Sequence, residues 1–109
     1  MEIWKRGIDF AKNTYKVVDR LPDTEKCGLK SRMTRAAVSI PSNIAEASSR
    51  KGKDFYHLLR VDLGSTYELD TQCIIAKDLM EDTEIFNNHI NRLIIEQKMF
   101  VNFLKSESK

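Results

Sequence analysis

The chain contains few residues that end helices, and it lacks a long apolar run. Its 109 residues include only 2 prolines and 4 glycines. No apolar run approaches the roughly 18 residues that a membrane span requires, and the amphipathic N-terminus lacks the apolar segment of a signal peptide. We therefore expect one soluble domain over residues 1–109, located in the cytoplasm and making no contact with a membrane.

Cysteine and glycine are also too sparse for the common catalytic motifs. Cys27 and Cys73 lie far apart within helical patterns, and isolated cysteines usually behave as small buried apolar residues. No serine or cysteine occupies a nucleophile elbow, and no glycine-rich loop precedes a helix as phosphate-binding loops require. Neither Glu46 nor Glu68 has an acid, nucleophile or oxyanion donor spaced to work with it. We expect no enzymatic activity, no catalytic residue and no cofactor.

The two histidines do not form a metal-binding pattern. A metal site inside a helical bundle needs repeated Glu-x-x-His pairs, whereas Asp54 precedes His57 by three positions and Phe86 precedes His89. We therefore expect no metal. The pattern indicates an interface or surface position for His57, and a partly covered surface position for His89 at the edge of an apolar face.

What the chain does contain is helical periodicity. Apolar residues recur at helical spacing, and no alternating run is long enough for a strand. Breaks fall at Leu21-Pro22-Asp23, between Ser48 and Lys53, and between Glu81 and Glu84. Connections this short place sequential helices antiparallel. The prediction is an all-α, antiparallel up-and-down four-helix bundle with helices at about 2–20, 24–48, 53–80 and 84–105.

Two large residues mark the first two predicted helices. Trp4 begins the apolar row of the first, and we expect it to anchor the core. Pro41, inside the second, cannot donate to the carbonyl of Ala37, so a kink is expected there. Three nearby side chains could satisfy the freed carbonyl: Ser39, Ser42 or Asn43.

The third predicted helix carries more apolar surface than one bundle interior covers. Val61, Ile75 and Leu79 lie roughly opposite its core row. Since a four-helix monomer buries one side of each helix, this surplus predicts self-association or a stable partner, with these three residues at the interface. Gly64 costs about 1 kcal/mol relative to alanine in a helix interior, which suits a position where another backbone crosses closely.

Charge is unevenly distributed along the chain. Residues 1–60 contain 13 Lys and Arg against 7 Asp and Glu, whereas residues 61–109 contain 5 against 9. The asymmetry fits either a basic face for RNA or DNA, or electrostatic complementarity between helices or subunits. A candidate phosphate-binding patch comprises Lys26, Lys30, Arg32, Arg50, Lys51 and Lys53. Such binding would be non-specific and salt-sensitive, and the alternative for the loop is ordinary solvation.

A polar stripe crosses the second and third predicted helices. Its residues are Arg35, Ser39, Asn43, Glu46, Ser65 and Glu68. One interpretation is a solvated face with weak ion pairs, each worth about 0–1 kcal/mol. The other is a hydrogen-bonded network at a subunit junction, which would fix which helices meet.

Two runs of the sequence carry a resemblance to a known family. Residues 35–46 read RAAVSIPSNIAE, and residues 64–69 read GSTYEL. Together they resemble the 23S rRNA intervening-sequence proteins, with matching positions from about Leu21 to Ala76. Ala47 stands where that family usually has glycine, and Asp62 stands where a small apolar residue is usual. A carboxylate at position 62 is hard to bury without a partner.

The resemblance implies a four-helix bundle that assembles into a ring-like homopentamer. A related branch, the accessory variability proteins of diversity-generating retroelements, associates with a reverse transcriptase and binds nucleic acid through a basic surface. We therefore expect a non-enzymatic, homo-oligomeric scaffold or adaptor with a possible nucleic-acid contact. The alternative is a protein-only interaction module of a mobile element or similar system, which would have a protein partner and no nucleic-acid affinity.

Overall fold

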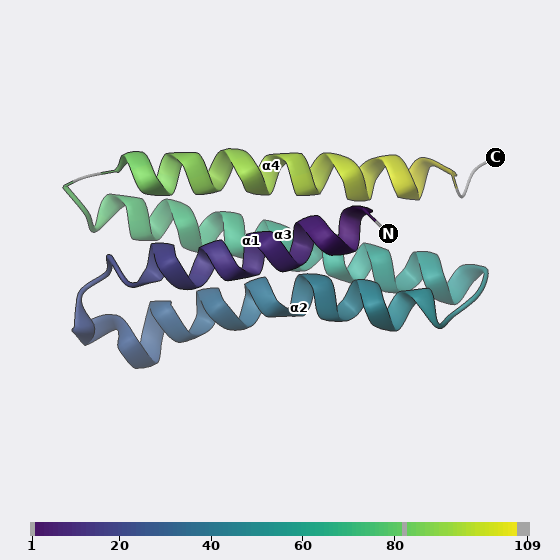
Figure 1. Cartoon of the computed structure of the whole chain (residues 1–109), viewed down its shortest axis with the longest axis horizontal. Coiled ribbons are helices and arrows are strands. Elements are labelled where there is room, and N and C mark those ends of the chain that lie inside the picture. Colours follow the sequence, from purple (N-terminus) through teal and green to yellow (C-terminus); the bar gives the residue numbers. More distant parts are fainter. Residues whose placement is uncertain (1, 82, 107–109) are drawn as a thin grey trace.

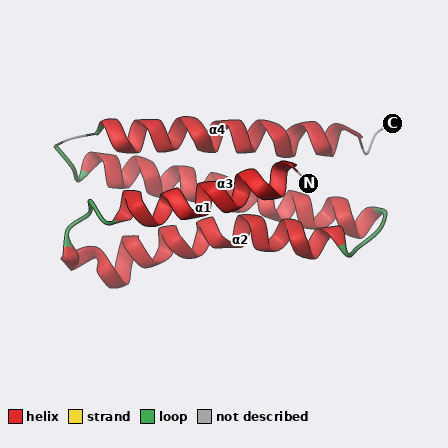
Figure 2. Cartoon of the chain, in the orientation of Figure 1, coloured by secondary structure: helices red, strands yellow, loops and turns green. Residues whose placement is uncertain are grey.

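The computed structural model describes residues 2–81 and 83–106, apart from the side chains of Lys26 and Cys27. These residues form four α-helices and no strand, which confirms the predicted all-α class. The helices are α1 (Glu2–Val18), α2 (Ser31–Ser48), α3 (Lys53–Asp78) and α4 (Glu84–Lys105). They lie side by side along the long axis of the molecule (Figure 1). The α1–α2 and α3–α4 connections lie at one end, and the α2–α3 connection lies at the other (Figure 2).

Most helix limits agree with the sequence prediction, but α2 begins later than expected. A 3-10 turn, η1 (Asp23–Glu25), and a short π-helix, η2 (Lys26–Lys30), occupy the segment that was expected to open the second helix. The backbone N–H of Leu29 donates to the Glu25 carboxylate at 3.5 Å, which supports this wider turn. None of the described helices is long and apolar enough to cross a membrane.

One apolar core runs between the helices. It includes buried rows of α2 and α3, and the large aromatic residues of α1 and α4 complete it. The α2 and α3 members are Met33, Ala36, Ala37, Ile40, Ile44, Ala47, Leu59, Leu69, Cys73 and Ala76. Burying a large apolar side chain contributes roughly 1.5–3 kcal/mol, so this shared core is the main reason that the helices stay together. The Cys27 side chain, predicted to be buried, lies outside the described residues.

α1 and α2 pack against each other at Gly7 and Pro41. A Cβ atom on Gly7 would lie 3.4 Å from the Pro41 Cβ and 3.5 Å from its backbone. α2 continues through this proline. The Ser39 hydroxyl donates to the Ala36 carbonyl at 2.6 Å, and Ser42 donates to Val38 at 2.8 Å. Since a hydroxyl has a single hydrogen to donate, neither serine satisfies Ala37 as the sequence suggested.

One expectation about packing is wrong. Trp4 does not anchor the core: it is 39% exposed and lines a shallow apolar cleft with Ile44, Ala45 and Ser48. The tight contact at Gly7, one turn away, leaves little room for an indole between α1 and α2. Gly64 meets no neighbour within the described chain, because a Cβ placed there would find no heavy atom within 4 Å. A backbone crossing at Gly64 therefore stays a prediction for contact between copies.

Candidate interface along α2 and α3

An open cleft of about 380 Å³ separates the exposed edges of α2 and α3. Arg32, Arg35 and Ser39 line it from α2, and Glu68 lines it from α3. The structure therefore brings together three members of the predicted polar network, Arg35, Ser39 and Glu68. Opposite charges face each other across this cleft, but no ion pair joins its two sides among the described residues.

Within a single copy, the charged residues of the network bond to neighbours along their own stretch of chain. Arg35 Nη2 donates to the Ser31 hydroxyl at 3.3 Å, and Gln72 Nε2 donates to Glu68 Oε1 at 3.3 Å. Arg50 Nη2 lies 2.8 Å from Glu46 Oε1 in an exposed ion pair. This geometry matches the solvated-face interpretation for one copy. A network formed across a subunit junction stays a prediction.

The candidate basic patch divides into two groups at the two ends of α2. Lys30 and Arg32 lie at the start of the helix, whereas Arg50, Lys51 and Lys53 follow its end. At 1.5 Å rise per residue, Arg32 and Arg50 are about 27 Å apart along the helix. Lys30 Nζ also lies 3.4 Å from Asp23 Oδ1. The described residues therefore form two small basic groups, and Lys26, the sixth predicted member, has no described side chain.

The three predicted interface residues lie on the outside of α3. Val61, Ile75 and Leu79 are 49%, 49% and 53% exposed. Glu68 lies halfway between Val61 and Ile75 in the sequence. Val61, Glu68 and Ile75 therefore recur every two helical turns on one side of α3. Gly64 is exposed nearby. This side of α3, together with the cleft-lining residues of α2, is the α2–α3 flank.

His89 is a residue that sequence reasoning placed wrongly. It is completely buried, and its ring stacks on Phe10 with centroids 4.2 Å apart. Its Nε2 lies 2.7 Å from the Thr14 hydroxyl, and its Nδ1 lies 2.9 Å from the Asn13 amide nitrogen. Position 89 continues the buried row of Phe86, Leu93 and Phe100 at helical spacing, which is the signal that could have located it.

The surrounding bonds define the state of this histidine. Thr14 donates its hydroxyl hydrogen to the Phe10 carbonyl at 2.9 Å, so its oxygen must accept from His89 Nε2–H. The Asn13 amide donates to Nδ1. These assignments are inferred from the network and give the neutral tautomer. Burial, with a smaller effect of Arg92, lowers the pKa of His89 to about 4, which agrees with a neutral ring.

Two further buried polar residues, Asp62 on α3 and Glu96 on α4, were not predicted as site residues. Asp62 has no exposed surface and Glu96 is 3% exposed. Burial raises the pKa of Asp62 to about 8; nearby Asn43 opposes the rise, and the Glu96 charge adds to it. Asn43 is close enough to act on this pKa, yet neither Asp62 oxygen has a hydrogen-bond partner among the described residues. Burial likewise raises the pKa of Glu96 to about 7, against the effect of Arg6.

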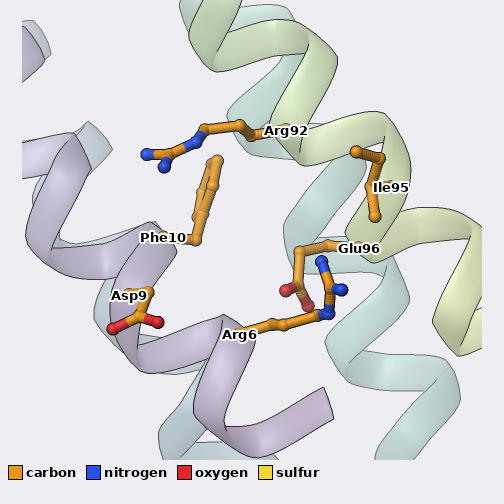
Figure 3. A pocket seen from close by; sticks show the side chains of 6 residues that line it. All are labelled: Arg6, Asp9, Phe10, Arg92, Ile95 and Glu96. Atoms are coloured by element: carbon orange, nitrogen blue, oxygen red, sulfur yellow. The ribbon is translucent and has the colours of Figure 1, made fainter. Parts of the chain in front are cut away.

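Glu96 lies beside a cleft of about 190 Å³ between α1 and α4. The side chains of Arg6 and Glu96 reach toward each other across it, while Arg92 extends past the ring of Phe10 (Figure 3). No group of three or more His, Cys, Asp or Glu side chains is placed to hold a metal in the described ranges. Burial raises the pKa of Cys73 to about 12, so this thiol stays protonated at neutral pH.

Comparison with known proteins supports the family resemblance. No curated protein matches this chain. A family model described as 23S rRNA-intervening sequence protein matches residues 1–102, and its match includes all of α1, α2 and α3 and most of α4. The chain therefore belongs to the 23S rRNA-intervening sequence protein family.

Proposed function

We propose that this protein is a non-enzymatic helical scaffold that assembles with copies of itself through the α2–α3 flank. The observation that carries the proposal is the half-exposed row of Val61, Ile75 and Leu79, which lies outside an already continuous core. A single exposed leucine needs no explanation, but an aligned apolar row on one helix side is typical of a contact surface.

The polar groups beside this row also suit contact between copies. Arg32 and Arg35 line one edge of the flank and Glu68 lines the other, with a cleft between them. A second copy can therefore offer each edge an opposite charge, while its apolar side chains cover those of α3. Exposed Gly64, which has no side chain, would let the backbone of the second copy approach α3 closely.

The proposed subunit is an antiparallel up-and-down four-helix bundle. The alternating ends at which the connections lie support this arrangement (Figure 1). Five copies in a ring is the number that the family resemblance implies, and the flank by itself does not define the number of subunits. Measurement of the molar mass in solution tests both assembly and number.

The test of the flank uses two neighbouring residues of α3. Ile75 and Ile74 are each 49% exposed, but successive residues point about 100° apart on a helix. Ile75→Lys adds a charge to the flank, and Ile74→Lys adds the same charge beside it. By size-exclusion chromatography with light scattering, we expect an oligomeric wild type, a largely monomeric Ile75→Lys and an oligomeric Ile74→Lys. Circular dichroism checks that both variants keep their helices.

A wild-type protein that stays monomeric at micromolar concentration would contradict the proposal. Equal loss of assembly in the two variants would show that the flank has no special role.

Contact with nucleic acid is a second proposed role, supported by the cations at the two ends of α2. Arg32, Lys51 and Lys53 are exposed and have no ion-pair partner among the described residues. Filter binding of RNA and DNA over a salt series tests this role, since phosphate contacts weaken steeply as salt rises. Negligible binding at every salt concentration would leave the protein-only interaction module as the function.

A further inference from the structure

Polar side chains from the other two helices act on two buried carboxyl groups, one on α3 and one on α4. Asn43 of α2 and Glu96 of α4 both act on the pKa of Asp62 of α3. The charge of Arg6 of α1 in turn acts on the pKa of Glu96. We refer to Arg6, Asn43, Asp62 and Glu96 as the polar cluster. The cluster is independent of the α2–α3 flank, because its two carboxyl groups are buried inside the subunit.

The polar cluster contains more buried acid than its cation can neutralise. Both oxygens of Asp62 and the Oε2 atom of Glu96 lack hydrogen-bond partners among the described residues. Arg6 is the cation that acts on Glu96, but its Nε also pairs with Glu2 at 3.3 Å. An ionised carboxylate buried without a full set of partners is strongly unfavourable.

The surrounding charged groups do not remove this imbalance. From α1, Arg6 and Asp9 line the cleft beside Glu96, and from α4, Arg92 lines it (Figure 3). Beyond Arg6, which already belongs to the cluster, these add one carboxylate and one guanidinium group. From α2, Asp62 is approached by Asn43, which has no charge to offer at any pH. A proton on each buried carboxyl group is the simplest way to complete the cluster.

We propose that Asp62 is protonated at and below neutral pH and Glu96 below neutral pH, and that they form a proton-dependent contact between α3 and α4. A protonated carboxyl group has an O–H that can donate to the Asn43 amide oxygen or to the other carboxyl group. When both groups ionise, they repel each other across the two helices. Water then enters through the cleft between α1 and α4, and α4 loosens from its neighbours.

The expected pH dependence has a definite sign. Burial raises the pKa of Asp62 from 3.8 to about 8 and that of Glu96 from 4.5 to about 7. The folded protein therefore holds these protons more tightly than the unfolded chain does. Their stabilisation is complete below the unfolded values and decreases as pH rises toward the folded values. Each group can increase the unfolding equilibrium constant by up to about tenfold per pH unit in this range.

Urea unfolding of the full chain between pH 6.5 and 9 tests the proposal. The comparison uses wild type, Asp62→Asn, Glu96→Gln and the matched control Asp78→Asn, which changes an exposed aspartate on the same helix. We expect the wild-type unfolding constant to rise with pH up to about 8 and then level off. Asp62→Asn should flatten much of this rise, Glu96→Gln should flatten its lower part, and Asp78→Asn should leave it unchanged.

Measurements at two protein concentrations separate this effect from any change in assembly. An unchanged pH profile in both Asp62→Asn and Glu96→Gln would overturn the proposal, and so would a wild-type stability that increases from pH 6.5 to 8.

Carbon-13 NMR of the side-chain carboxyl groups gives a direct reading that does not depend on unfolding. The Asp62 resonance, assigned by its loss in Asp62→Asn, should titrate near pH 8. Titration below pH 5 would show a carboxylate that is ionised in the fold and would overturn the proposal. Stabilisation of the wild type by Mg²⁺ or Ca²⁺ at pH 8.5 that disappears in Asp62→Asn would also overturn it, because a metal rather than a proton would then complete the cluster.

Discussion

His89 and Asp62 are both completely buried polar residues, but the chain provides partners for one of them and not for the other. Both ring nitrogens of His89 have hydrogen-bond partners, and Phe10 stacks on its ring. Both oxygens of Asp62 lack such partners among the described residues. A buried polar group with all its hydrogen bonds made behaves as part of the core. The effect of a buried carboxyl group without such bonds on stability depends on whether it is protonated, and therefore on pH.

The difference also separates the pH ranges in which the two residues affect stability. The pKa of His89 is lowered to about 4, so protonation disrupts its site on the acid side. The pKa of Asp62 is raised to about 8, so its carboxyl group loses its proton, and its site is disrupted, as pH rises into the mildly alkaline range. Each residue is neutral in the folded protein near pH 6. Acidification charges His89, and a rise in pH charges Asp62, so the two residues reduce stability on opposite sides of pH 6.

Removal of the fully bonded residue should have the largest effect. His89→Ala leaves a cavity against Phe10 and removes the partners of Thr14 and Asn13. We expect a loss of about 3 kcal/mol or more in the free energy of unfolding, measured by urea denaturation at pH 7. His57→Ala, which changes the exposed histidine of α3, is the matched control and should change stability little. Similar losses in the two variants would mean that the His89 network contributes nothing special.

The acid range should reveal the charge state of His89. Its pKa falls from 6.5 to about 4 on folding, so the unfolded chain binds the proton first. The stabilisation is complete above pH 6.5 and decreases as pH falls toward 4, by about 3 kcal/mol in total. Asp62 and Glu96 act in the opposite direction over the same range. The measurement is therefore the stability of wild type minus that of His89→Phe, which keeps an aromatic ring without the titrating group.

This difference should shrink steadily between pH 6.5 and pH 4. Parallel profiles for the two proteins would show that His89 is already protonated in the fold, and the neutral network described above would then be wrong.

The sequence predicted the helices well because their limits depend on local signals. Breakers near Pro22, Gly52 and Glu81 separate the apolar rows, and three of the four α-helices both begin and end within two residues of expectation. The late start of α2 depends on a side-chain contact from Glu25 and on backbone geometry, which apolar periodicity does not report.

The positions of individual polar and aromatic residues were harder to predict because they depend on neighbouring helices. His89 is buried since α1 offers Asn13, Thr14 and Phe10 at the same height. Trp4 is displaced to the surface because Gly7 brings α1 close to α2. The basic residues at 30–32 and 50–53 look alike in the sequence, but they lie far apart in space because the length of α2 separates them.

Buried Gly7 and exposed Gly64 extend the comparison to positions without a side chain, where the expected effects are smallest. A Cβ on Gly64 meets nothing within 4 Å, whereas one on Gly7 meets Pro41 at 3.4 Å. Gly64→Ala should therefore stabilise a single subunit by about 1 kcal/mol through helix propensity, and Gly7→Ala should be tolerated, because its Cβ would make ordinary van der Waals contact with Pro41. If a second copy covers the α2–α3 flank, the same Gly64→Ala change should weaken assembly in light scattering while it raises subunit stability in dilute urea titrations. A variant that is stabilised and assembles like wild type would show that no backbone crosses at Gly64, and the contact between copies would then have to lie elsewhere.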